Sequence, residues 1–167
     1  MANRKLLTCV LAGLLLLASD TSLPAAQLNL EYSALTSTID KLSDSDRMTV
    51  YDAIALIKKG NNGQALARLN ALNDRQPDNS AIRILTAYAL LQVGNLLGAF
   101  ENAQAAEKTP GGNAYACWFL AKVALLSGRN EVCRREMSHL EKGGAPAAQI
   151  RELRAELTAK EKGKPKN

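Results

Sequence analysis

Apolar residues recur along most of this chain at the spacings of three and four that place them on one face of an α-helix. Three glycines in this pattern, Gly60, Gly94 and Gly128, are 34 residues apart. Each follows an apolar-rich block and precedes a second periodic one. A fixed period of this length is typical of helical repeat proteins, in which each unit buries its apolar face against its neighbours. The pattern therefore predicts a stack of helical hairpins.

The periodic blocks predict three helix pairs, at 46–59 with 63–75, 80–93 with 96–108, and 114–127 with 130–142. The glycine inside each pair allows the positive φ that ends a helix at low cost. Asn79 and Asn113 stand at N-cap positions, and the run from Ser43 to Asp46 offers capping oxygens and negative charge before the first pair. We expect the repeats to span 46–79, 80–113 and 114–145.

Partial units are expected at both ends of the stack. Apolar residues at helical spacing predict an N-terminal helix within 28–42, and its apolar face consists of Tyr32, Leu35, Ile39 and Leu42. We interpret 26–45 as a capping helix and linker that covers the open end of the stack. Glu31 stands at the position where the full repeats have a small residue. At the other end, 146–162 is predicted to form a capping helix and 163–167 a basic disordered tail. The stripe of this last helix consists of Ile150, Leu153 and Leu157.

The first residues have the pattern of a targeting segment. A short basic start, with Arg4 and Lys5, precedes an apolar run that is too short to predict a membrane span. Small residues suited to cleavage follow at Ala25 and Ala26. Residues 1–25 are therefore predicted to be a secretory signal peptide that is removed after Ala25. The alternative is an uncleaved membrane anchor.

Composition and charge refine this picture. Alanine and leucine dominate and aromatic residues make up only 4% of the chain, a mixture that favours helices. The formal net charge is +5, but four lysines against one glutamate in the last nine residues account for +3 of it. We interpret these lysines as a solvated tail rather than as an anchor for nucleic acid or an anionic membrane. No stretch interleaves basic and aromatic residues, so we expect no nucleic-acid partner.

The period and the small-residue positions resemble those of the tetratricopeptide repeat (TPR) family over about 46–146. The matching small residues are Ala53, Ala87 and Ala121 in the first helices, and Ala65, Ala99 and Cys133 in the second. Bulky residues match at Leu69 and Met137, with Ala103 in the middle repeat. Pro77 closes the first repeat, whereas Pro110 and Pro146 are displaced by one. Polar residues replace expected apolar ones at Thr49, Asp52, Arg83 and Thr86.

The resemblance implies an all-α fold: a right-handed superhelical stack of three TPR hairpins with an N-terminal half-repeat helix and a C-terminal capping helix. It also implies a concave groove, lined by the first helices, that binds a protein or peptide. The groove residues carried over from the family are Arg47, Val50, Ile54, Tyr88, Gln92, Tyr115, Trp118 and Lys122. Tyrosine and tryptophan are favoured at binding hot spots, and Lys122 would favour an acidic group on the ligand. Alternatively, adjacent repeats or the terminal helices bury these side chains.

Candidate catalytic chemistry is sparse. His139 is the only histidine, and Cys133, six residues before it, does not share its helix face. No metal-ligand spacing, phosphate-binding glycine loop or nucleophile motif is present, so we expect no enzyme, no cofactor and no metal. Cys117 and Cys133 are predicted to be free thiols, because the hairpin register separates them by roughly 10 Å along the helix axis.

These observations together predict an exported TPR adaptor or scaffold that binds a protein or peptide segment. The resemblance and the predicted signal peptide favour the periplasm of a Gram-negative cell and a role in envelope assembly. One alternative is a self-associating structural subunit of an envelope complex. Another is a TPR protein held at the inner membrane by an uncleaved N-terminal anchor. We expect a monomer or a weak homo-oligomer.

Overall fold

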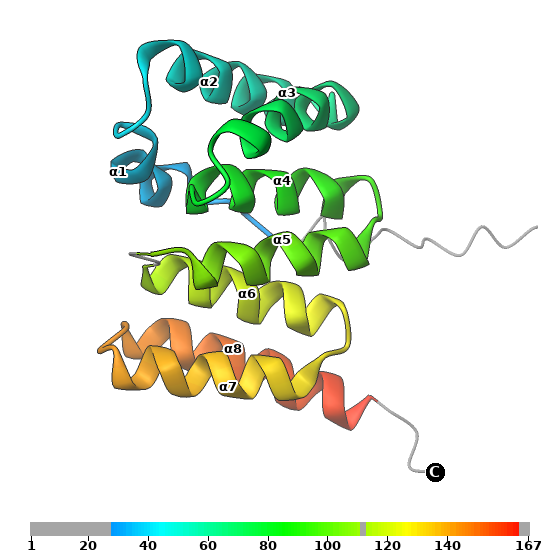
Figure 1. The fold of residues 1–167 in the computed structure, drawn as a ribbon. Coiled ribbons are helices and arrows are strands. Elements are labelled where there is room, and N and C mark those ends of the chain that lie inside the picture. The colour runs from blue at the N-terminus through cyan, green and yellow to red at the C-terminus, as the bar shows by residue number, and fades with distance from the viewer. Residues whose placement is uncertain (1–27, 111–112, 164–167) are drawn as a thin grey trace, which may run out of the picture.

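The protein is all-α over residues 28–110 and 113–163, the part of the chain that the computed structural model describes (Figure 1). Its helices are η2 (Tyr32–Leu35, a 3₁₀ turn), α1 (Thr36–Ile39), α2 (Asp44–Lys58), α3 (Asn62–Arg75), α4 (Ser80–Gln92), α5 (Leu96–Lys108), α6 (Ala114–Leu126), α7 (Asn130–Lys142) and α8 (Ala147–Lys162). The predicted signal peptide and most of the predicted tail lie outside the described residues. Among the described helices, none is long and apolar enough to cross a membrane.

Helices α2 to α7 form three hairpins, α2–α3, α4–α5 and α6–α7, which lie one below another in Figure 1. Their bounds differ from the predicted ones by at most two residues. Each hairpin turns at the predicted glycine, with φ of 77° at Gly60, 80° at Gly94 and 72° at Gly128. A side chain would strain this left-handed backbone. The predicted caps Asn79 and Asn113 each accept the backbone N–H three residues further on.

Small residues allow these helices to pack closely. The ones predicted for this role are all fully buried: Ala53, Ala65, Ala87, Ala99, Ala121 and Cys133. Packing continues from one hairpin to the next, since α3 contacts α4 and α5 contacts α6. At the first of these junctions the amide of Asn73 donates to Oγ1 of Thr86 over 2.9 Å, and both residues are buried. The polar residue at Thr86 therefore joins two hairpins through a hydrogen bond.

The N-terminal segment does not form the predicted end cap. Its helical part covers only 32–39, and α1 contacts α4, on the side of the stack formed by the first helices. Met48 and Tyr51 on α2 are 63% and 43% exposed, so the outer side of the first hairpin stays open. Glu31 explains the difference, because a charged side chain in the small-residue slot opposes the close approach of two helices. The apolar residues of the segment are nevertheless buried: Leu28, Leu35, Ile39 and Leu42.

Helix α8 takes the position predicted for the C-terminal capping helix. Its stripe of Ile150, Leu153 and Leu157 is buried, and the helix contacts both α6 and α7. Lys160, near its end, donates to the carbonyl oxygen of Leu125 at the end of α6. Helix α8 therefore lies beside α6 as the first helix of another hairpin would.

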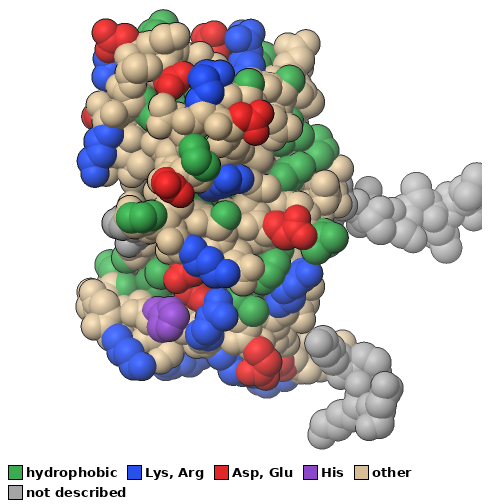
Figure 2. Space-filling view, viewed as in Figure 1, with side chains coloured by type: hydrophobic (Ala, Val, Ile, Leu, Met, Phe, Trp, Pro, Cys, Tyr) green, Lys and Arg blue, Asp and Glu red, His purple; other side chains and the backbone are tan. Residues whose placement is uncertain are grey.

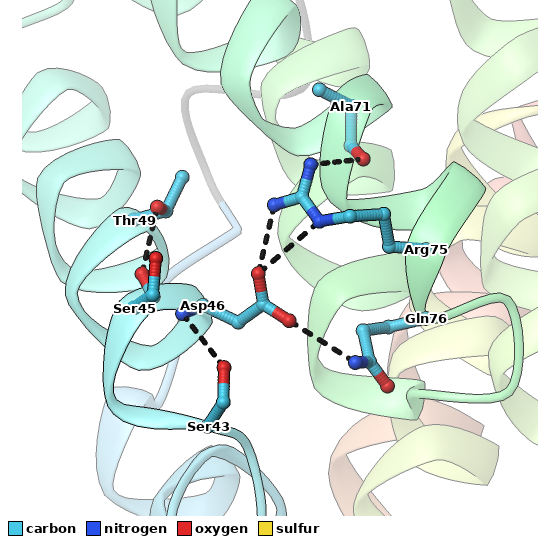
Figure 3. A network of polar contacts seen from close by, with 7 residues as sticks. All are labelled: Ser43, Ser45, Asp46, Thr49, Ala71, Arg75 and Gln76. Atoms are coloured by element: carbon cyan, nitrogen blue, oxygen red, sulfur yellow. Dashed lines mark hydrogen bonds and ion pairs between the residues drawn. The ribbon is translucent and has the colours of Figure 1, made fainter.

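A nearly buried carboxylate joins the start of α2 to the end of α3 (Figure 3). Asp46 Oδ1 accepts a hydrogen bond from Arg75 Nη2 over 2.8 Å, and its Oδ2 accepts one from Gln76 Nε2 over 3.1 Å. The backbone N–H of Asp46 donates to the hydroxyl of Ser43, the N-cap of α2. The hydrogen bonds from Arg75 and Gln76 lower the pKa of the Asp46 carboxyl below its ordinary value.

The lowered pKa of Asp46 predicts a pH-dependent contribution to stability. This contribution is present above the unfolded pKa of about 3.9 and is lost as the pH falls through the folded value. At pH 7, Asp46→Asn should reduce the free energy of unfolding by about 1–2 kcal/mol in urea denaturation. The difference from wild type should narrow as the pH falls below about 4. Asp52→Asn on the same helix is the control, because its ion pair with Arg68 is exposed and 3.6 Å long. Equal effects of the two substitutions would contradict this account.

Candidate functional site

The predicted groove residues belong to α2, α4 and α6, and we call the side of the stack that these three helices form the first-helix face. Val50 and Ile54 on α2 belong to the core, at 0% and 8% exposure. Arg47, one turn before Val50, is half-buried and pairs with Asp44 of its own helix. These three residues of the predicted set therefore offer little surface to a ligand.

The remaining predicted residues come together on α4 and α6. The rings of Tyr115 and Trp118 stack with their centroids 5.4 Å apart, and Lys122 Nζ lies 5.6 Å from the centroid of the Trp118 ring. Tyr88 on α4 is half-buried and hydrogen-bonded with Gln92 one turn later. The aromatic cluster predicted from the sequence is thus present on this face, partly covered.

One covering element is the N-terminal segment, residues 28–39. The backbone N–H of Glu31 donates to the hydroxyl of Tyr115 over 2.8 Å, a contact across 84 residues of sequence. Lys58 Nζ at the end of α2 lies 4.7 Å from the centroid of the Tyr32 ring. Leu28 is only 5% exposed. The protein therefore holds a stretch of its own chain on the face that was predicted to hold a ligand.

Burial on this face affects the tyrosines. It raises the pKa of Tyr115 to about 12, and the hydrogen bond from the N–H of Glu31 opposes only part of that rise. Burial also raises the pKa values of Tyr32 and Tyr88. The Tyr115 hydroxyl consequently stays protonated at neutral pH, where it accepts from the backbone as a neutral group.

The second covering element is α8. Lys122 Nζ donates to Glu152 over 2.6 Å and to Glu156 over 2.5 Å, and the lysine side chain is only 11% exposed. Burial alone would lower the pKa of Lys122, but the hydrogen bonds and charges of the two glutamates reverse the effect and raise it. Because two carboxylates already neutralise this lysine, it does not offer a free positive charge to an acidic ligand.

Two pockets remain open beside Leu28. One, of about 330 Å³, is lined mainly by apolar residues at the ends of α6 and α8, with Lys122 at its side. The other, of about 320 Å³, is lined by Leu28, Asn29, Glu31, Trp118, Lys122, Gln149 and Glu152. Trp118 Nε1 is buried and has no hydrogen-bond partner among the described residues. A buried donor of this kind usually has an acceptor, and the Trp118 side chain also lines this pocket.

Sequence reasoning missed the residues that cover the face. Glu156 could have been found, because it stands 34 residues after Lys122 and thus occupies the equivalent position one repeat later. The contact between Glu31 and Tyr115 has no such signal, since nothing in the sequence period relates the two residues.

Two further features bear on chemistry and partners. Cys117 and Cys133 are free thiols, and Cys117 lies near the carboxylates of Glu107 and Glu136, a grouping that the sequence spacing did not suggest. On the side of the molecule shown in Figure 2, acidic side chains lie among basic ones over the upper part, and Lys and Arg side chains are more numerous over the lower part.

In comparisons with known proteins, no family model, no curated protein and no solved structure matches this chain.

The ion pairs of Lys122 should stabilise the docking of α8 on α6. In a double-mutant cycle of Lys122→Met with Glu156→Gln, we expect a coupling free energy of about 1 kcal/mol in urea denaturation, because the lysine is nearly buried while the glutamate is half-exposed. The control cycle is Arg154→Met with Glu141→Gln, an exposed pair on neighbouring helices, whose coupling should be smaller. A coupling free energy near zero in the cycle of Lys122 with Glu156 would show that this ion pair does not stabilise the docking of α8.

Proposed function

We propose that this protein is an exported helical-repeat adaptor of the TPR type that binds a segment of a partner protein on its first-helix face. The all-helical stack of hairpins is the architecture of repeat proteins, whose extended surfaces bind protein partners. The predicted signal peptide favours a role at the cell envelope, and we propose the periplasm as the compartment. No constellation typical of catalysis was found in the sequence, which favours binding over enzymatic activity.

The self-occupied first-helix face supports the proposal most strongly. Residues 28–31 precede the first helical turn, and there the backbone of Glu31 is bound by a side chain of α6 while Leu28 is buried. A surface that binds its own non-helical segment through the backbone and an apolar side chain has the chemistry needed to bind such a segment from another protein. The pocket beside Trp118 leaves room for additional contacts.

The chemistry of the face defines the partner segment. An apolar side chain would enter the place of Leu28, and a backbone carbonyl would accept from the buried Nε1 of Trp118. Glu31 and Glu152 line the same pocket, and the positive charge of Lys122 is already neutralised. A neutral or basic segment therefore fits better than the acidic one expected from the sequence.

The N-terminal segment should compete with such a partner for the first-helix face. A substitution that weakens the segment should therefore increase partner binding, and a substitution that weakens the face should decrease it. In affinity capture from envelope extracts, Leu28→Ala should increase capture by up to about tenfold, because the bound self-segment is weakened. Trp118→Phe should reduce the affinity for the captured partner by roughly tenfold, because the ring is kept but the Nε1–H donor is lost.

Tyr51→Ala, on the exposed outer side of α2, is the matched control and should leave capture unchanged. Thermal melting of each variant shows whether the fold is intact. Capture that is unaffected by Leu28→Ala and by Trp118→Phe in folded proteins would rule out this face as the binding site.

Self-association is the second candidate function, and one observation favours it. Met48 and Tyr51 are exposed one turn apart on α2, at the end of the stack that the N-terminal segment leaves open. Exposed apolar side chains at the end of a repeat stack favour end-to-end contact between copies. A molecular mass that rises with protein concentration in the wild type, and not in Tyr51→Ala, would support this alternative over a monomeric adaptor.

A further inference from the structure

A cluster of metal-ligand groups lies where α5, α6 and α7 meet. Glu107 on α5, Cys117 on α6 and Glu136 on α7 each offer a ligand atom, and these atoms all lie within 4.8 Å of one another. The three residues come from two successive hairpins and were not related by any motif in the sequence. Glu107 and Cys117 are half-buried, so the cluster is open to ions from solution.

Glu136 is the residue that distinguishes this cluster from an ordinary group of surface acids. Its side chain is fully buried, although carboxylates are almost never buried without a compensating partner. Arg135 holds one oxygen, Oε1, with Nε at 2.8 Å and Nη2 at 2.7 Å. The other oxygen, Oε2, has no hydrogen-bond partner among the described residues, and His139 Nδ1 lies 3.4 Å from it. This buried carboxylate therefore lies next to a second carboxylate and next to the Cys117 thiol, which is hydrogen-bonded with it.

We propose that Glu107, Cys117 and Glu136 bind a divalent transition-metal ion such as Zn²⁺. A thiolate with two carboxylates suits Zn²⁺ or Co²⁺ and does not suit Mg²⁺ or Ca²⁺, which prefer oxygen ligands alone. In a tetrahedral site the ligand atoms lie about 3.5 Å from one another, so the cluster needs to close by little more than about 1 Å.

The charges of the cluster agree with a bound cation. Burial raises the pKa of the Cys117 thiol, and the negative charges of Glu136 and Glu107 raise it further, so a cation beside the two carboxylates would favour the thiolate. Binding of one divalent ion would release the thiol proton to solvent and form the metal–sulfur bond. Two carboxylates and one thiolate would then surround the ion, with the guanidinium of Arg135 balancing the remaining negative charge through Glu136.

A metal at this position would also connect the second and third hairpins, because its ligands come from both. His139 is a positioning residue in this account, since its ring lies beside Oε2 of Glu136 rather than among the three ligand groups.

The experiment uses the reduced, untagged full chain with Co²⁺ as the probe and Zn²⁺ as the competitor. Co²⁺ bound to a thiolate gives a sulfur-to-cobalt charge-transfer band in the near ultraviolet. We expect one Co²⁺ per chain, a band that Zn²⁺ abolishes, and a melting temperature that rises with Zn²⁺. Cys117→Ser should abolish the band, and Glu107→Gln and Glu136→Gln should each weaken Co²⁺ binding by about tenfold or more.

The buried cysteine provides the matched control. Cys133→Ser, at the thiol that lies 4.0 Å from Met137, should retain the band and the affinity. If circular dichroism shows that Glu136→Gln does not fold, Co²⁺ binding by Glu107→Gln, at the half-buried residue, tests the role of the glutamates. The proposal is overturned by a wild-type chain without the band, by a band that survives Cys117→Ser, or by Co²⁺ binding that neither glutamate substitution weakens.

Discussion

Close packing between successive helices is the constraint on which the rest of this structure depends. Alanine or cysteine stands at the same two positions of every hairpin, and all six of these residues are fully buried. Because these side chains are small, each helix can bury its apolar face against its neighbours at short distance. The same spacing repeats every 34 residues and sets equivalent positions of α4, α6 and α8 beside one another, so Lys122 meets Glu156. Helix α8 is held in place by this repetition as well as by its own apolar stripe.

The repeats form the first-helix face, and two other parts of the same chain cover side chains on it. The N-terminal segment binds there through Leu28 and through the backbone of Glu31, while α8 neutralises Lys122. A partner that uses this face must therefore displace or extend a segment that is already bound. Such competition lowers the apparent affinity by the fraction of molecules in which the face is open. Regulation of binding by the N-terminal segment would follow directly from this arrangement.

Much of the fold could be predicted from the sequence, because helix ends, caps and turns depend on nearby residues and recur with the period of the repeat. The glycine turns, the caps at Asn79 and Asn113 and the bounds of α2 to α8 all follow from patterns within one repeat. The N-terminal segment could not be placed, since its stripe is compatible with packing at the end of the stack or across its face. Glu31 and Tyr115 are 84 residues apart in the sequence, and no repeat position relates them. Nothing in the sequence around a tyrosine indicates which backbone group its hydroxyl will accept from. The cluster of Glu107, Cys117 and Glu136 was missed for the same reason, because three helices bring it together.

Amide hydrogen exchange of residues 28–39 measures whether this segment is bound on the first-helix face. The Glu31 amide should exchange slowly in the wild-type protein, and Tyr115→Phe, which removes its acceptor, should accelerate this amide far more than the amides of α4. Exchange of the whole segment at the rate of an unstructured peptide in the wild-type protein would show that the segment is not bound there.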